Sequence, residues 1–326
     1  MVFGTGEPGS ILPLSFFRSR KDELTGLPTM MEFMNQAKRR LAEDGSGAFL
    51  YFNIENFRMI NKNYGFIAGN SLLCKFSKQM RQVFGDVPMA RLNDDRFIVM
   101  TSPGEARVLT QLDNFRERMA EADPRFTLVI KVGGYEPNPE VKDVAHMLDR
   151  AKMACDSIRG IYDTNFAWFE PSMEEDLNLK SYIVGHFEEA LEKHWIEAWY
   201  QPEVRVATGE ICGFEALARW NDPIYGMLPP VKFVSVLEDS HLSHRLDLYM
   251  LREVCEDFRR IDENAEEGWK PTHVSVNLSR IDFQLVNMRQ EIELIRREYG
   301  VSRDRLHIEI TESALNDTDK YFKREI

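Results

Sequence analysis

Short apolar runs typical of β-strands alternate with segments of helical periodicity along this chain. Residues 48–54 and 126–132 are such runs in the first half, and residues 68–84 between them repeat apolar side chains with the period of a helix. Helical bundles and all-β sandwiches lack this order of elements. With 326 residues, the chain is predicted to form about two domains.

The first half predicts an α+β sheet. Helices are expected over residues 105–120 and 141–158, and a short last strand over 165–169. Residues 88–100 predict two strands around residues 93–95, where Asn and Asp tolerate positive φ and favour a hairpin turn. A hairpin within this mixed order favours an α+β sheet over a doubly wound one.

The second half predicts a parallel sheet or barrel. A Pro-containing acidic stretch at residues 171–176 is the expected boundary, and a helix is expected over 177–193. Strand-like segments alternate with helical stretches after it. The strands are expected at 198–206, 211–218, 273–278 and 306–311, and the helices within 230–261 and 283–299.

The charge balance narrows the possible partners. Lys and Arg number 41 and Asp and Glu 53, for a net charge of −12, so no basic stripe is available to follow a nucleic-acid duplex. No apolar run reaches the roughly 18–20 residues of a membrane-spanning helix. The four cysteines show neither metal-site spacing nor the density of a disulfide scaffold. We expect a folded, cytoplasmic protein that does not bind DNA.

Three strands of the second half each carry an oxygen ligand. Glu215 and Glu309 lie inside apolar runs, where an unpaired charge is costly, and Asn277 lies near the end of a third strand. In a β/α barrel the carboxyl ends of the strands form the active-site face, where such donors could converge on Mg²⁺ or Mn²⁺. The alternative is that each is a solvated or locally hydrogen-bonded residue, and spacing does not decide between the two.

Five short blocks of the second half occur in a fixed order. They read Tyr200-Gln201-Pro202, Thr208-Gly209-Glu210, Gly213-Phe214-Glu215-Ala216-Leu217-Ala218-Arg219-Trp220, Val276-Asn277-Leu278-Ser279 and Glu309-Ile310-Thr311-Glu312-Ser313. Together they resemble the EAL-domain family of cyclic di-GMP phosphodiesterases. The letters Glu-Ala-Leu alone would be a weak signal, whereas five ordered blocks are a specific one.

This resemblance implies the amino-terminal part of a TIM-type (β/α) barrel that hydrolyses cyclic di-GMP to pGpG at a two-metal site. The implied catalytic residues are Glu215, Asn277, Glu309 and Glu312, of which the first three match ligands of Mg²⁺ or Mn²⁺ and Glu312 matches a residue that steadies a loop. The implied substrate contacts are Gln201, Leu217 and Arg219, with Arg219 on a phosphate. A strand-end hydrogen bond for Gln201 and a surface ion pair for Arg219 are the alternatives.

The family's second ligand set is a pair of aspartates followed by Lys, Glu and Gln, and none of it occurs before Ile326. A barrel usually needs about 250 residues, and residues 181–326 supply about half. We expect this chain to be part of a longer protein, inactive by itself. The longer protein is expected to be a homodimer and could be tethered to a membrane by a sensor domain.

The first half carries a second set of motifs. These are Asp22-Glu23-Leu24-Thr25-Gly26-Leu27-Pro28, the block from Asn53 to Asn61, and Gly65 with Gly69-Asn70. They resemble the GGDEF family of diguanylate cyclases over about residues 21–170. The resemblance implies a ferredoxin-like, nucleotide-cyclase-type fold.

The hairpin that names that family is altered here, and reads Asn93-Asp94-Asp95-Arg96-Phe97. Side chains in place of glycines hinder the approach of a triphosphate, Arg96 replaces an acid, and Asn53 replaces a metal-binding Asp. We therefore predict an inactive cyclase. Asn61 matches a guanine-contacting residue, so a GTP-sensing pocket is a hypothesis, and a polar helix cap is its alternative.

The favoured interpretation is a cyclic di-GMP phosphodiesterase with an inactive GGDEF domain. The expected organisation is an N-terminal segment (1–20), a GGDEF domain (21–170), a linker (171–180) and an incomplete EAL domain (181–326). The alternative is a receptor that binds cyclic di-GMP without cleaving it.

Overall fold

The computed structural model describes residues 20–138, 141, 143–264, 272–279 and 281–310. The chain separates into two compact units, the first ending at Glu175 and the second beginning at Asp176. Each unit has its own sheet and its own hydrophobic core. Of the helices in the described residues, none combines the length and the apolar character needed to cross a membrane.

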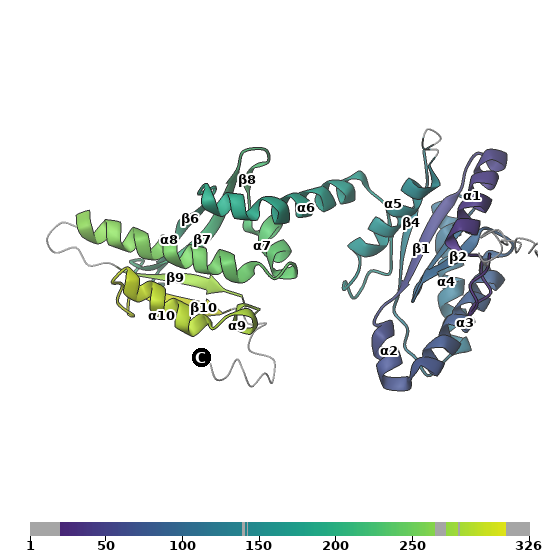
Figure 1. Ribbon diagram of the computed structural model, residues 1–326, viewed down its shortest axis with the longest axis horizontal. Coiled ribbons are helices and arrows are strands. Elements are labelled where there is room, and N and C mark those ends of the chain that lie inside the picture. The colour runs from purple at the N-terminus through teal and green to yellow at the C-terminus, as the bar shows by residue number, and fades with distance from the viewer. Residues whose placement is uncertain (1–19, 139–140, 142, 265–271, 280, 311–326) are drawn as a thin grey trace, which may run out of the picture. The chain divides into compact units, whose positions relative to one another are not determined.

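The first unit is a five-stranded sheet in the order β2-β3-β1-β4-β5, with helices on both faces (Figure 1). The strands are β1 (Ala48–Ile54), β2 (Met89–Asn93), β3 (Arg96–Thr101), β4 (Ile130–Tyr135) and β5 (Phe166–Trp168). The helices are α1 (Met30–Asp44), α2 (Phe57–Tyr64), α3 (Phe66–Phe84), α4 (Glu105–Ala122) and α5 (Val144–Ser157). The β4–β5 pair is parallel and the other pairs are antiparallel, which confirms the predicted α+β sheet with a hairpin.

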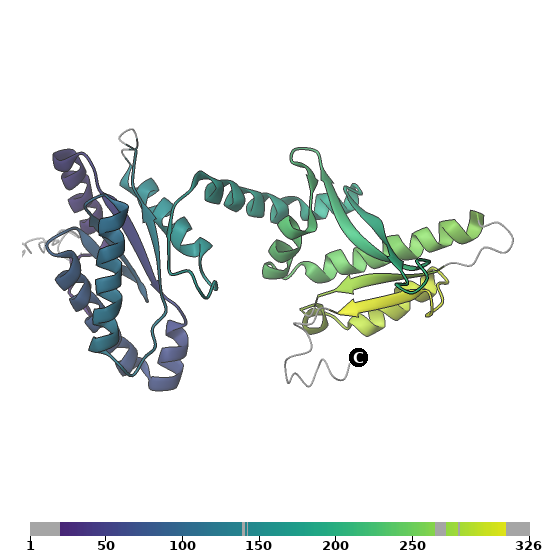
Figure 2. The same cartoon turned by 180° about the vertical axis from the view of Figure 1, so that it is seen from behind.

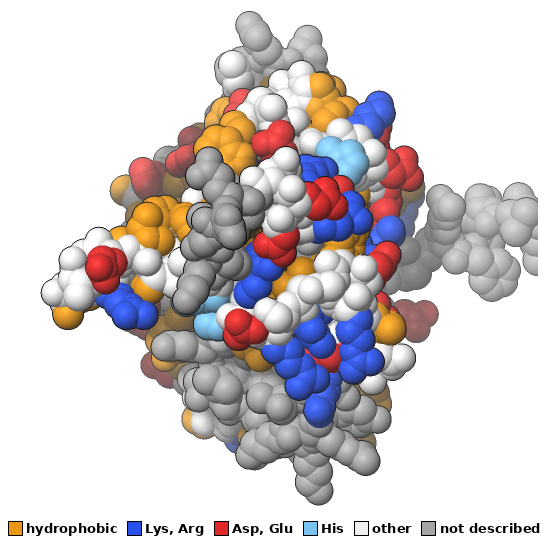
Figure 3. All heavy atoms as spheres, turned by 90° about the vertical axis from the view of Figure 1, so that its left-hand side faces the viewer, with side chains coloured by type: hydrophobic (Ala, Val, Ile, Leu, Met, Phe, Trp, Pro, Cys, Tyr) orange, Lys and Arg blue, Asp and Glu red, His pale blue; other side chains and the backbone are white. Residues whose placement is uncertain are grey.

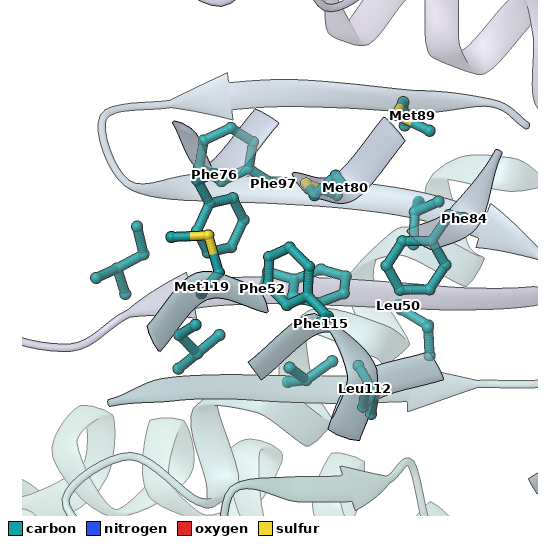
Figure 4. Close-up of a cluster of buried hydrophobic side chains, with 14 of the residues drawn as sticks. Leu50, Phe52, Phe76, Met80, Phe84, Met89, Phe97, Leu112, Phe115 and Met119 are labelled. Atoms are coloured by element: carbon teal, nitrogen blue, oxygen red, sulfur yellow. The ribbon is translucent and has the colours of Figure 1, made fainter. Parts of the chain in front are cut away.

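The central strand β1 is buried at every position, as its almost wholly apolar sequence predicts. Its Phe52 ring contacts Phe76, Phe84 and Phe115 on α3 and α4, with centroid distances of 6.1, 5.9 and 5.6 Å. Figure 4 shows these rings gathered on one face of the sheet. On the other face α1 and α5 pack against the alternate side chains of β1.

Lys131 of β4 is fully buried, an expensive position for a charged side chain unless its donors are satisfied. Its Nζ donates to the carbonyl oxygens of Ile161 and Thr164 at 2.5 and 2.6 Å and to Oδ1 of Asn165 at 3.2 Å. Lys131 thereby anchors the loop that follows α5.

The second unit is a sheet in the order β10-β9-β7-β6, with β8 paired to β7. The strands are β6 (Ile196–Val204), β7 (Ile211–Asp222), β8 (Gly226–Leu228), β9 (His273–Leu278) and β10 (Leu306–Ile310). The helices are α6 (Pro171–Glu192), which begins in the first unit, α7 (Pro230–Asp239), α8 (Ser243–Asn264), α9 (Asp282–Leu285) and α10 (Met288–Glu298). Strands β7, β9 and β10 are parallel, and the described sheet is open, as expected for part of a TIM-type barrel.

The described helices of this unit pack on one face of its sheet. In Figure 1 α8 and α10 lie in front of the strands, and in Figure 2 the strands lie in front of the helices. Ala216 and Trp220 of β7 and Val276 of β9 point into this helical layer. Their neighbours in sequence point to the opposite face, because side chains alternate along a strand.

Acidic and basic side chains are interspersed on the surface, as Figure 3 shows for one face. On α10, Glu293 lies 2.9, 3.5 and 2.9 Å from nitrogens of Arg296, Arg297 and Arg303. Hydrogen bonds from Arg296 and Arg303 lower the pKa of Glu293 to about 2. These basic residues are therefore partnered.

The structure differs from the sequence-based expectation in four places. Strand β6 is antiparallel to β7, because the short turn between them contains Gly209 at φ 74° and no crossover connection. Strand β4 begins at Ile130, since Phe126 instead closes a turn on Asp123. Helices α1 and α2 were not predicted. The helix expected over 177–193 begins earlier, at Pro171, because proline suits the first position of a helix.

Candidate functional site

The sheet face away from the helices in the second unit carries most of the predicted site residues. Glu215 lies on β7, Asn277 on β9 and Glu309 on β10, all on this face. Glu309 is the direct register partner of Asn277, and Asn277 Nδ2 donates to Glu215 Oε1 at 2.6 Å. The structure thus brings together three residues that are far apart in sequence.

The donor set suits a hard divalent cation. Glu215 and Glu309 supply carboxylate oxygens, and the carbonyl oxygen of Asn277 is left for a ligand because its amide nitrogen faces Glu215. Within the described residues no group of three or more Asp, Glu, His or Cys side chains is arranged to hold a metal ion. The binding of a divalent ion here would therefore depend on Asn277, which is the third oxygen donor beside Glu215 and Glu309.

The predicted substrate contacts lie on the same face. Gln201 of β6 is the register partner of Glu215, while Leu217 and Arg219 follow Glu215 along β7. The Arg219 guanidinium donates to the Ala218 carbonyl oxygen at 2.9 Å. Glu312 lies outside the described residues. Alternation along β6 adds Trp199, the register partner of Leu217, whose side chain is 50% exposed.

A cluster of acidic side chains holds the end of β9, two residues after Asn277. The Ser279 amide donates to Asp247 Oδ2 at 2.8 Å and to Asp282 Oδ2 at 3.1 Å, and its hydroxyl donates to Glu238 Oε1 at 2.7 Å. Asp282 is fully buried. Our sequence reasoning missed this cluster, because no spacing rule brings α7, α8 and α9 to one serine.

Desolvation, followed by hydrogen bonding and repulsion from Asp282, raises the pKa of Asp247 well above its ordinary value. The folded state therefore holds a proton that the unfolded state releases, so stability falls as the pH rises above the ordinary Asp value. We expect Asp247→Asn to stabilise the second unit by about 1 kcal/mol at neutral pH, because Asn can accept from Ser279 and donate to Asp282. Urea unfolding at pH 5 and pH 8 checks this: an equal effect of the substitution at both values would contradict it.

The first unit contains a cleft of about 870 Å³ between the end of β1, the β2–β3 hairpin and α2. Every position of the altered signature except Phe97 lines it, and Phe97 is buried in the core. Asn53, Asn61, Arg58 and Arg159 also line the cleft. Sequence reasoning had not included Arg58 or Arg159.

Residues that do not line this cleft hold its β2–β3 hairpin in place. Arg91 donates to the Asp94 carbonyl oxygen at 3.0 and 2.7 Å and to the two carboxylate oxygens of Asp22 at 3.4 and 3.3 Å. Asp22 also accepts from the amide and hydroxyl of Thr25 at 2.8 and 2.6 Å. Although burial opposes the shift, these hydrogen bonds and the charge of Arg91 lower the pKa of Asp22. The backbone at Asp94 is thereby held at φ 32°.

The cleft is a poor site for divalent metals. Asn53 faces Arg96 in register across β1 and β3, where the family pattern has acids. Burial raises the pKa of Asp95, and Glu55 Oε1 already accepts from the Gly160 amide at 2.9 Å. The residues present therefore do not fit the Mg²⁺ ions of a diguanylate cyclase.

Two family models match this chain. "Diguanylate cyclase, GGDEF domain" matches residues 19–160 and "EAL domain" matches residues 185–324. The uncharacterized protein y4lL of Sinorhizobium fredii is 29% identical over 310 residues, covering 91% of this chain and 36% of its own length. "Cyclic di-GMP phosphodiesterase NbdA" of Pseudomonas aeruginosa is 27% identical over 308 residues, covering 91% and 39%.

A solved structure shares the fold. The S helix-GGDEF-EAL region of Vibrio cholerae LapD, bound to c-di-GMP, aligns with a TM-score of 0.56 and 15% identity, covering 94% of this chain and 73% of that one. The chain spans a little over a third of the length of the curated relatives that it matches first, at 36–38%.

Proposed function

This chain belongs to the proteins in which a GGDEF domain precedes an EAL domain, and from that premise we propose that the full-length protein uses this second unit to bind cyclic di-GMP and hydrolyse it to pGpG. The observation that carries the proposal is the convergence of Glu215, Asn277 and Glu309 on a sheet face that no described helix covers. The name of NbdA and the ligand of LapD support the choice of substrate.

Glu215, Asn277 and Glu309 would hold Mg²⁺ or Mn²⁺. Bound divalent ions supply positive charge beside the phosphodiester and an activated water. Arg219 is placed on the same strand as Glu215 to bind a phosphate oxygen through its guanidinium. Leu217 and its register partner Trp199 offer an apolar surface to a guanine base, and Gln201 offers hydrogen bonds beside Glu215.

For the first unit we propose guanine nucleotide binding without cyclisation. Asn53 and Arg96 occupy positions where a two-metal reaction needs acidic side chains. Among the described residues Asn61 Oδ1 has no hydrogen-bond partner and lies against Gly69. A buried acceptor without a donor costs about 1–3 kcal/mol, so turning the Asn61 side chain from Gly69 toward a donor of a base bound in the cleft would relieve that cost.

Incubation of the full-length protein with cyclic di-GMP in Mg²⁺ or Mn²⁺, with chromatography of the products, tests the main proposal. We expect pGpG to form, and EDTA to abolish its formation. Binding without cleavage would replace the phosphodiesterase with the receptor alternative, and neither binding nor cleavage would reject both. Incubation with GTP and Mg²⁺ is expected to yield no cyclic di-GMP, and its formation would refute the inactive-cyclase proposal.

A further inference from the structure

The cleft of the first unit is lined by three arginines from three different segments. Arg96 begins β3, Arg159 lies in the turn after α5, and Arg58 lies in the first turn of α2. Arg96 and Arg159 lie near the same two titratable groups, Asp95 and Cys155. Burial raises the pKa of both groups, and the positive charges of the two arginines oppose this rise. Their positive charges therefore converge on one part of the cleft.

Acidic partners are few for these guanidinium groups, although Arg96 contacts the Tyr51 hydroxyl: burial raises the pKa of Tyr51 to about 12 against the charge and hydrogen bond of Arg96. Among the described residues no carboxylate forms an ion pair with Arg96, and the only one recorded for Arg159 is Asp156 at 3.6 Å, where both side chains are largely exposed. An exposed pair of this kind is worth about 0–1 kcal/mol.

Three carboxylates also line the cleft. Burial raises the pKa of Asp95 and Glu55 accepts from the Gly160 amide, so Asp94 is the acid that would repel a bound anion most directly.

The two arginines are also held in place. Arg96 is fixed by the register of β3 against Asn53 of β1. Two hydrogen bonds hold the turn that carries Arg159. The Gly160 amide donates to Glu55 at 2.9 Å, and the buried Lys131 donates to the Ile161 carbonyl oxygen at 2.5 Å. A positive charge on an ordered backbone is a preorganised anion site.

We propose that the guanidinium groups of Arg96 and Arg159 stand in place of divalent cations, and that this cleft binds the phosphates of a nucleoside triphosphate without a metal. The inference rests on the nucleotide binding proposed above and goes beyond it by replacing the metal. An arginine side chain can bind two phosphate oxygens at once and remains charged at all ordinary pH values. Without a metal-activated hydroxyl, the bound nucleotide is a ligand rather than a substrate.

Calorimetric titration of the whole chain with GTP, once in EDTA and once in Mg²⁺, tests the inference. We expect the dissociation constant in EDTA to be no more than about twofold weaker than in Mg²⁺, and guanosine to bind more weakly than GTP. Arg96→Ala and Arg159→Ala are each expected to weaken binding about 10-fold in EDTA, or about 1.4 kcal/mol. Arg107→Ala, on the exposed side of α4, is the matched control and should leave binding unchanged.

The outcomes separate the two proposals. Binding that requires Mg²⁺ would overturn the metal-free inference while leaving nucleotide binding intact. Binding in EDTA that survives both arginine substitutions would overturn the assignment of these residues. No binding at millimolar GTP in either buffer would reject the nucleotide proposal itself. Because Arg159 is exposed in a turn, Arg159→Ala is expected to fold and keeps the test valid if Arg96→Ala does not.

Discussion

Replacing Glu215 by alanine is expected to lower the rate of cyclic di-GMP hydrolysis at least about 100-fold. Loss of groups that only orient metal ligands already costs roughly 10–100-fold, and Glu215 is itself a proposed ligand. The substitution also leaves Asn277 Nδ2 without its acceptor at 2.6 Å, so the amide loses its orientation. The rate of pGpG formation at saturating Mg²⁺ or Mn²⁺ measures the effect.

Two further variants make this result specific. Glu215→Gln keeps an oxygen that can accept from Asn277 but removes the charge, so it should retain the fold and lose most of the activity. Glu192→Ala removes an exposed carboxylate at the end of α6 and should retain full activity. Equal activity of Glu215→Ala and the unmodified protein would exclude Glu215 as a metal ligand.

Replacing Phe52 by alanine is expected to destabilise the first unit by about 3–5 kcal/mol, the usual cost of deleting a buried aromatic ring. Phe52 is fully buried and contacts three other rings across the interface between β1, α3 and α4. Phe76 and Phe84 lie on α3 and Phe115 lies on α4, so the backbones of two helices limit how far these rings can move into the space it leaves. Guanidinium unfolding followed by circular dichroism measures the loss.

The matched control is Phe66→Ala. Phe66 opens α3 with 77% of its surface exposed, so its removal should change stability by less than about 0.5 kcal/mol. A similar effect of both substitutions would contradict the central position assigned to Phe52. Because the two units have separate cores, the transition of the second unit should stay unchanged in both variants.

The elements that sequence predicts best are those whose environment is uniform. Residues 48–54 and 273–278 match β1 and β9 at both ends, because both are short interior strands: β1 is almost wholly apolar, and β9 alternates polar with apolar residues. The antiparallel pairing of β6 was not foreseen, since it depends on the length of one turn rather than on strand composition. The placement of Phe126 was also missed, because its contact with Tyr64 is tertiary.

The two candidate sites also differ in how well the sequence predicts them. Period-two alternation from Glu215 accounts for Leu217 and Arg219, so a strand motif is sufficient to place them on one face. The position of Arg159 at the cleft depends on the hydrogen bonds of its turn to Lys131 and Glu55. Each bond joins residues more than 25 positions apart, so a local sequence pattern cannot predict it. The assignments of metal ligands and substrate contacts stay predictions until the assays above are made.

The opening motif of the first unit, residues 22–28, helps to fix the conformation of the β2–β3 hairpin. Thr25 donates to Asp22, Asp22 accepts from Arg91, and Arg91 holds the backbone of Asp94, while none of Asp22, Thr25 and Arg91 lines the cleft. That role does not depend on which side chains the hairpin presents to a ligand. An intact opening motif therefore reports a well-formed hairpin rather than a working cyclase, and searches for active enzymes should score the hairpin residues separately from it.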